Sequence, residues 1–226
     1  MNTGVIWFRN ALRLNDNRVL VECLNSTNSQ RILPLYILDK SDLEQNNNEN
    51  RIKFLYESLI DLDANFKNKF GSNLIVLNGK SKDIFRKLLD SDLLGLSEIF
   101  TDYSNKPDDI ENENNLKNIL AENDSVELHL ISKVNSLTNV QEVVSQENFK
   151  PPKTMKDMEK LFSNLYPKDE DGFYSIDEPL DIPESSKPIY ENSSEIIKDY
   201  LFDVKKELSC WKRIQNLISK VANLKH

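Results

Sequence analysis

Glycine and cysteine are scarce in this chain, and their scarcity argues against several kinds of protein. Only five glycines occur in 226 residues. None of the expected strands is followed by a Gly-x-Gly-x-x-Gly or Gly-Lys-Ser/Thr loop of the kind that cradles phosphates. The two cysteines, Cys23 and Cys210, are too few for a disulfide framework, which indicates a reducing compartment. With only two histidines, His129 and His226, we expect no zinc-type metal site.

Long apolar runs are missing as well. Apolar residues make up 38% of the chain and the mean hydropathy is −0.55, and no run approaches the roughly 18 residues of a membrane span. The chain enters an expected strand almost at once, so we expect no signal peptide. These features predict a protein of the cytoplasm, the nucleus or both, with no membrane partner.

The charge is acidic, with a formal net value of −8. Lysine and arginine are scattered rather than gathered in a basic run, so binding to the DNA backbone by this chain alone is disfavoured. The acids of residues 108–113 are expected to form a solvated helix face. No Ser/His/Asp or Cys/His set is recognisable, so we expect no independent catalysis.

Apolar runs alternate with helical patterns through the first two thirds of the chain. Strands are predicted at residues 5–8, 31–38, 74–77, 98–101 and 126–131, and helices between them, the clearest carrying an apolar stripe from Ile52 to Phe66. Alternation of this kind requires crossover connections. It therefore predicts an α/β fold, a Rossmann-like five-stranded parallel sheet with helices on both faces.

The composition changes after about residue 149. A short helix is predicted from Thr154 to Leu165, which closes a first domain at residues 1–165. Residues 166–193 are rich in proline and acids and suit a linker. Residues 194–226 form an amphipathic helical segment, whose apolar stripe either folds back on the first domain or covers a partner.

Polar residues follow three of the expected strands. Arg9 and Asn10 follow the first strand, Asp39 the second, and Asp102 and Tyr103 the fourth. Because the carboxyl ends of parallel strands meet at one edge of a sheet, where α/β proteins bind ligands, these residues are candidates for a binding site. Polar residues also collect at strand ends in any sheet, so the sequence leaves both interpretations open.

Other residues of the opening stretch have structural interpretations. Trp7 is predicted to lie in the core. Arg9 and Arg13 either hold an anion or tie the first loop to a carboxylate, and the second interpretation is favoured. Asp16 or Asn17 is expected to cap the helix that follows.

Several motifs resemble the cryptochrome/photolyase family. Residues 7–17, WFRNALRLNDN, look like the family's opening pattern of Trp-Phe-Arg, two variable positions, Leu-Arg-Leu and Asp-Asn. Residues 33–39, 77–79 and 150–154 are similar to its second strand, its third strand with a glycine, and its Pro-Pro-x-Thr passage. Residues 50–65 resemble the animal cryptochrome and six-four photolyase branch, and the likeness runs over roughly residues 4–165.

The resemblance implies the family's N-terminal α/β domain. In the family this domain can hold an antenna pigment, a folate or a flavin, and by position Arg9, Asn10, Asp39 and Tyr103 would flank it. The loop from Lys40 to Asn50 would border a pocket for protein partners. The second domain of the family is helical and binds FAD. We expect it to be missing here, so that FAD is implied only if such a domain follows.

Departures from the family pattern lie in the loops at the sheet edge. Ala11, Asn15 and Arg18 replace its usual residues, and the passages at 101–108 and 133–138 differ from it. These changes favour a retained scaffold over a retained pigment site.

The leading hypothesis is therefore a non-catalytic module of light-signalling or circadian type. It would bind a partner protein through the loop from Lys40 to Asn50 or through the C-terminal helix. The alternatives are a truncated piece of a FAD-dependent photolyase or blue-light photoreceptor, and an antenna-pigment binding domain.

Overall fold

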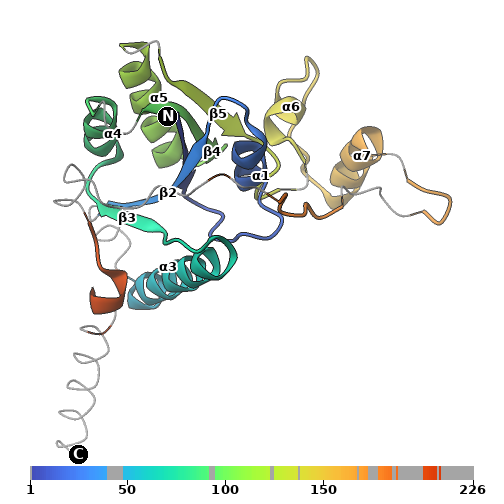
Figure 1. Ribbon diagram of the computed structural model, residues 1–226. Helices are drawn as coiled ribbons and strands as arrows, with labels where there is room; N and C mark the ends of the chain where they lie inside the picture. Colours follow the sequence, from blue (N-terminus) through green and yellow to red (C-terminus); the bar gives the residue numbers. More distant parts are fainter. Residues whose placement is uncertain are drawn as a thin grey trace, which may run out of the picture.

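A five-stranded parallel sheet forms the centre of the protein (Figure 1). The computed structural model describes residues 2–39, 48–91, 95–122, 125–136, 138–166, 168–172, 178–184, 187, 201–207 and 209. The strands are β1 (Thr3–Phe8), β2 (Arg31–Leu38), β3 (Ile75–Asn78), β4 (Leu96–Asp102) and β5 (Glu127–Ile131). They lie in the order β3-β2-β1-β4-β5, and every pair is parallel. The predicted α/β class is confirmed.

Strand β1 lies in the middle of the sheet and is buried along its whole length. Its side chains alternate between two hydrophobic cores, with Ile6 and Phe8 in one and Val5 and Trp7 in the other. A strand covered on both faces needs apolar residues at every position, which explains why its sequence shows no polar alternation.

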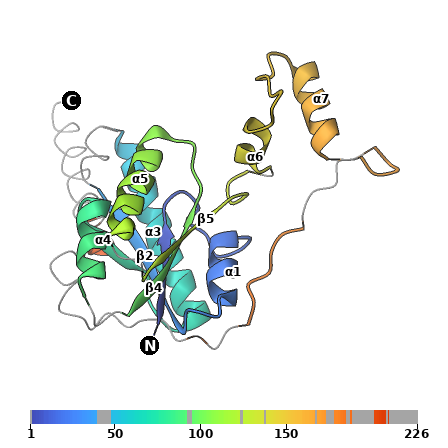
Figure 2. The same cartoon turned by 90° about the horizontal axis from the view of Figure 1, so that it is seen from above.

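Helices cover both faces of the sheet (Figure 2). Helices α1 (Arg18–Asn25) and α3 (Glu49–Phe70) pack on the face of Ile6 and Phe8. Helices α4 (Ser81–Leu89) and α5 (Pro107–Ala121) pack on the opposite face. Among the described residues, no helix is long and apolar enough to cross a membrane.

Local signals explain where the helices begin and end. Of the two candidates for the cap of α1, the structure selects Asn17, whose Oδ1 accepts hydrogen bonds from the backbone N–H groups of Val19 and Leu20 at 3.0 and 3.3 Å. Helix α3 ends at Gly71, whose φ of 71° lies in the left-handed region that glycine adopts without strain.

Among the described residues, two further helices are α6 (Val140–Val144) and α7 (Met155–Leu165). Helix α7 stands apart from the sheet (Figure 1). Thr154 caps α7 in a reciprocal pair with Asp157: its Oγ accepts from the Asp157 backbone N–H at 3.2 Å, and the carboxylate accepts from the Thr154 N–H at 3.0 Å. The predicted start of this helix is thus observed. Neither helix has a buried residue.

The described part of the C-terminal segment returns to the first domain. Leu201 forms an antiparallel bridge with Leu77 of β3, and the Phe202 N–H donates to the Val76 carbonyl at 2.9 Å. Val204 is buried in the core on the α3 side. Of the two predicted uses of this segment, residues 201–207 therefore fold back, while most of the predicted helix lies outside the described residues.

Replacing Val204 by alanine is expected to lower the free energy of unfolding by about 1–3 kcal/mol, because it removes buried methyl groups and leaves a cavity. Urea denaturation measures the change. Val144→Ala in α6 is the matched control, since Val144 is 53% exposed and should cost little. Equal effects of the two substitutions would contradict the observed packing.

Candidate functional site

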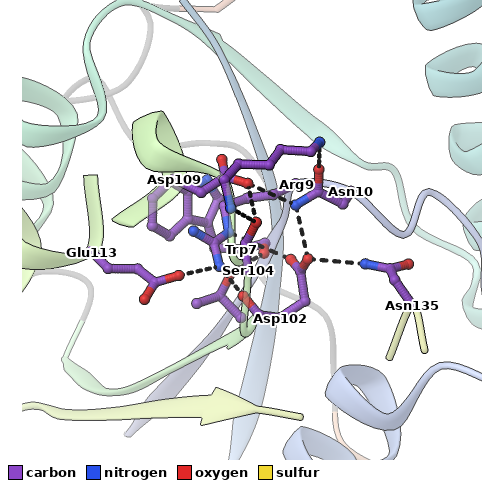
Figure 3. Close-up of polar contacts among 10 residues, drawn as sticks. Trp7, Arg9, Asn10, Asp102, Ser104, Asp109, Glu113 and Asn135 are labelled. Atoms are coloured by element: carbon purple, nitrogen blue, oxygen red, sulfur yellow. Dashed lines mark hydrogen bonds and ion pairs between the residues drawn. The ribbon is translucent and has the colours of Figure 1, made fainter. Parts of the chain in front are cut away.

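The order of the strands reverses between β1 and β4, the position where open α/β sheets bind ligands. β1 is followed by Arg9 and Asn10, and β4 ends in Asp102. These residues meet at the carboxyl edge of the sheet, as the sequence predicts (Figure 3). Their contacts decide whether the position is open to a ligand.

Arg9 forms a buried ion pair with two carboxylates. Its Nε lies 3.4 Å from Asp102 Oδ1, and its Nη2 donates to Glu113 Oε1 at 2.9 Å and to the Asp102 backbone carbonyl. The three side chains are 7%, 3% and 4% exposed. The guanidinium also lies 5.0 Å from the centre of the Trp7 ring, within the range of a cation–π contact. The expectation that the acids of α5 all face solvent is wrong for Glu113, because Arg9 compensates its charge.

Asn10 extends this network. Its Nδ2 donates to Asp102 Oδ2 at 3.0 Å and to Asp109 Oδ2 at 3.1 Å, while the Lys106 ammonium donates to its Oδ1. Asn135 donates to the same Asp102 oxygen at 3.2 Å. The cavity beside the network measures about 180 Å³, below the roughly 300–1,000 Å³ of small-molecule sites. The protein's own side chains therefore occupy the switch point.

A larger cleft of about 530 Å³ lies next to the network, between the end of β2 and the start of α3. Its lining combines polar and apolar side chains. The residues are Arg9, Asn10, Leu12, Tyr36, Ile37, Leu38, Asp39, Asn48, Asn50, Arg51, Ile52, Phe54, Leu55, Ser58 and Lys106. Phe54 is 70% exposed, which is unusual for so large an apolar side chain.

The structure brings three of the four predicted binding residues to this cleft. Arg9, Asn10 and Asp39 line it, whereas Tyr103 does not. The Tyr103 backbone N–H donates to the Ile131 carbonyl at 2.8 Å, so this residue continues the pairing of β4 with β5. Of the predicted partner loop, Asn48 and Asn50 line the cleft, and residues 40–47 lie outside the described part of the chain.

The remaining residues of the opening stretch have local roles. Trp7 is 4% exposed and packs edge-on against Phe85, with ring centres 4.9 Å apart. The guanidinium of Arg13 donates to three backbone carbonyls, including that of Val134 at 2.8 Å, and so ties the loop to the chain after β5. Asp16 adopts a φ of 49°, and its carboxylate accepts from the Leu180 N–H at 3.1 Å.

Sequence reasoning missed a second polar cluster, nearer the amino ends of β4 and β5. Glu98 Oε2 accepts hydrogen bonds from the hydroxyls of Ser26, at 2.6 Å, and Ser29, and its Oε1 lies 3.1 Å from His129 Nε2. Burial alone raises the pKa of the Glu98 carboxyl, but the bonds from the two serines and His129 outweigh it and hold the pKa below its usual value. The sequence offered one signal for this cluster, the Glu-x-His pattern at Glu127 and His129. This pattern lies on β5, the strand that pairs with β4 beside Glu98.

Replacing Arg9 by methionine is expected to lower the free energy of unfolding by about 3–5 kcal/mol, because two buried carboxylates lose their cation. Urea denaturation measures the change. Arg13→Met is the matched control; Arg13 is 43% exposed, and its loss should cost about 1 kcal/mol. Adding Glu113→Gln to Arg9→Met should recover part of the loss. A cost for Arg9→Met no larger than the control's would show that the ion pair does not stabilise the fold.

The sequence matches the model of the family described as DNA photolyase over residues 4–171. Cryptochrome-1 of Spalax judaei is 31% identical over 181 residues, which cover 80% of this chain and 28% of that protein. Cryptochrome-1 of Gallus gallus is 32% identical over 165 residues, covering 73% of this chain and 25% of that protein. The chain thus spans little more than a quarter of the length of these relatives.

Solved structures show the same fold. An archaeal photolyase from Sulfolobus tokodaii superposes with a TM-score of 0.67 at 20% identity, covering 92% of this chain and 41% of that one. A cryptochrome of Synechocystis gives a TM-score of 0.66 at 19% identity, covering 85% and 38%. With the matched motifs and the parallel sheet, these findings show that the chain belongs to the DNA photolyase family, with its cryptochromes, and carries the family's N-terminal α/β domain.

Proposed function

We propose that this chain is a non-catalytic, cryptochrome-like regulatory module that binds a partner protein in the cleft between β2 and α3. One observation carries the proposal. The switch point of the sheet is occupied by the ion pair of Arg9 with Asp102 and Glu113, while among the described residues a cleft of about 530 Å³ opens beside it.

The buried ion pair argues against a reactive site at the switch point. A ligand there would have to displace Arg9 from carboxylates that are 3% and 4% exposed. Leaving such carboxylates without their cation costs about 3–5 kcal/mol, which would be subtracted from any binding energy. The switch point therefore has a structural role, and we expect the partner to bind in the neighbouring cleft.

The cleft has the chemistry of a protein-binding surface. Ile52, Phe54 and Leu55 supply apolar area from the first turns of α3, and Arg51 and Lys106 add positive charge at the rim. Exposed aromatic side chains beside arginine are typical anchors of protein interfaces. We therefore expect the partner to insert a segment with a large apolar side chain next to an acidic one. The predicted partner loop adjoins the cleft through Asn48 and Asn50.

The similarity to proteins named Cryptochrome-1 is consistent with the proposed regulatory role. The location in the cytoplasm or nucleus stays a prediction from the sequence. Because the chain spans 28% of the first of these proteins, the flavin chemistry and DNA repair of whole photolyases are a separate proposal. Those activities would require the helical FAD-binding domain that the resemblance assigns to the second part of family members.

Photo-crosslinking tests the partner proposal. A photoreactive phenylalanine analogue at Phe54 should crosslink one specific protein in cells of the source organism. The same analogue at Met155, which is 84% exposed on α7 and remote from the cleft lining, is the control. The Phe54 product should disappear when Ile52→Asp is added in the cleft, and the Met155 pattern should not change.

Three outcomes would contradict the proposal. Equal labelling from Phe54 and Met155, or a Phe54 product that survives Ile52→Asp, would show that the cleft is not the binding surface. Light-dependent repair of damaged DNA by the purified chain alone would show that it is an enzyme.

An antenna-pigment carrier is the second candidate function. The cleft volume lies within the roughly 300–1,000 Å³ of small-molecule sites. Arg9, which lines the cleft, keeps one guanidinium nitrogen, Nη1, without a hydrogen-bond partner among the described residues. This nitrogen is buried, so a pigment oxygen would accept from it only after a side-chain rearrangement. The photolyase from Sulfolobus tokodaii was solved with two FAD molecules, with the implication of a novel light-harvesting cofactor in that protein.

Absorption spectroscopy decides on this second candidate. If the protein carries a folate or flavin, the purified chain incubated with each pigment should keep an absorption band above about 320 nm after gel filtration, beyond the protein's own band near 280 nm. Ile52→Asp should remove that band, whereas Met155→Asp on α7 should not. A spectrum with the protein band alone would rule the carrier function out.

A further inference from the structure

The sheet register places three metal-ligating residues on one face of β4 and β5. Glu98 and Glu127 are direct partners in the parallel pairing of these strands, and His129 follows Glu127 by two positions. Since side chains alternate along a strand, Glu127 and His129 point to the same face. Glu98 and Glu127 lie four residues before the carboxyl ends of their strands and His129 two, and none of the three lines the cleft.

The ligand atoms are close enough for one ion to bind all three. His129 Nε2 lies 3.1 Å from Glu98 Oε1 and 3.8 Å from Glu127 Oε2, and all three atoms lie within 4.8 Å of one another. Bonds of about 2.0–2.2 Å in a tetrahedral site place neighbouring ligand atoms about 3.3 Å apart. Small side-chain rotations of the more exposed Glu127 would therefore complete the arrangement.

Surrounding side chains already orient two of the ligands. The hydroxyls of Ser26 and Ser29 both donate to Glu98 Oε2, which leaves Oε1 directed at His129. The His129 ring stacks on Phe100, with centroids 4.4 Å apart and an angle of 14° between the planes. Outer partners of this kind hold ligands in position in protein metal sites.

Exposure increases across the cluster. The side chain of Glu98 is 4% exposed, that of His129 27% and that of Glu127 66%. An ion would therefore rest on a buried, fixed carboxylate and remain open to solvent on one side, where water would fill the remaining coordination positions.

We propose that Glu98, Glu127 and His129 bind a divalent transition-metal ion, with Zn²⁺ as the best fit. The imidazole nitrogen favours Zn²⁺ over Mg²⁺, which prefers oxygen ligands and an octahedral shell. The ion would fasten the edge strand β5 to β4. The competing explanation is that hydrogen bonds among the three side chains alone hold the cluster together, which needs no metal.

Thermal unfolding of metal-stripped protein during titration with ZnCl₂ or MgCl₂ tests the proposal. Zinc at about 100 times its dissociation constant should raise the melting temperature by about 5–10 °C, and magnesium at the same concentration should not. His129→Gln and Glu127→Gln should each weaken zinc binding at least about 10-fold. Glu127 is mostly exposed, so its variant should still fold.

Two variants separate this site from adventitious binding. His226→Gln, at the only other histidine of the chain, should keep the full zinc effect. Ser26→Ala touches no metal but should weaken binding about 10–100-fold, because Glu98 loses an orienting hydrogen bond. No zinc effect on the wild type, or an effect that His129→Gln leaves unchanged, would overturn the proposal and favour a cluster held by hydrogen bonds alone.

Discussion

The buried ion pair of Arg9 with Asp102 and Glu113 is the interaction on which the carboxyl edge of the sheet depends. It joins the end of β1, the end of β4 and the second turn of α5 in one place. None of the three charges is stable there alone, since removal of one member leaves the others buried without compensation. The pair therefore fixes how β1 and α5 sit at the point where the chain reverses its direction of winding.

The usual ligand position of this fold, the switch point of the sheet, is therefore distinct from the open cleft among the described residues. The switch point is occupied by the network around Asn10 and Asp102, and the open surface lies one strand further, beside β2 and α3. Phe54 and Arg51 of the cleft belong to neither hydrophobic core, whereas Ile52 and Leu55 pack against the core on the α3 side, so the cleft adjoins that core.

Most of the fold follows from local patterns in the sequence. The unbroken apolar run of residues 5–8 predicts a strand covered on both faces, and the stripe from Ile52 to Phe66 predicts α3, because both depend only on periodicity. The burial of Glu113 was not predictable, since it requires Arg9, more than a hundred residues earlier, to neutralise it. Tyr103 was misplaced relative to the cleft because it follows β4, which lies on the other side of β1 from β2, where the cleft opens.

The candidate metal cluster eluded sequence reasoning for a related reason. Metal-site motifs are recognised in a sequence from ligands that are close to one another along the chain. Glu98 and His129 are far apart in the sequence and come together only through the register of the parallel strands β4 and β5. A single residue's shift in that register would send Glu127 and His129 to the opposite face. Such a site can be recognised only once the pairing of the strands is known.

The contact of Leu201 with Leu77 also has a consequence for the order of folding. It closes a loop of roughly 120 residues, and the entropy of closing so long a loop must be overcome before the contact contributes stability. The sheet and its four covering helices can assemble from shorter-range contacts first. The returning segment is then expected to dock last during folding and to detach first under mild denaturation, which would uncover the edge of β3 while the rest of the sheet stays formed.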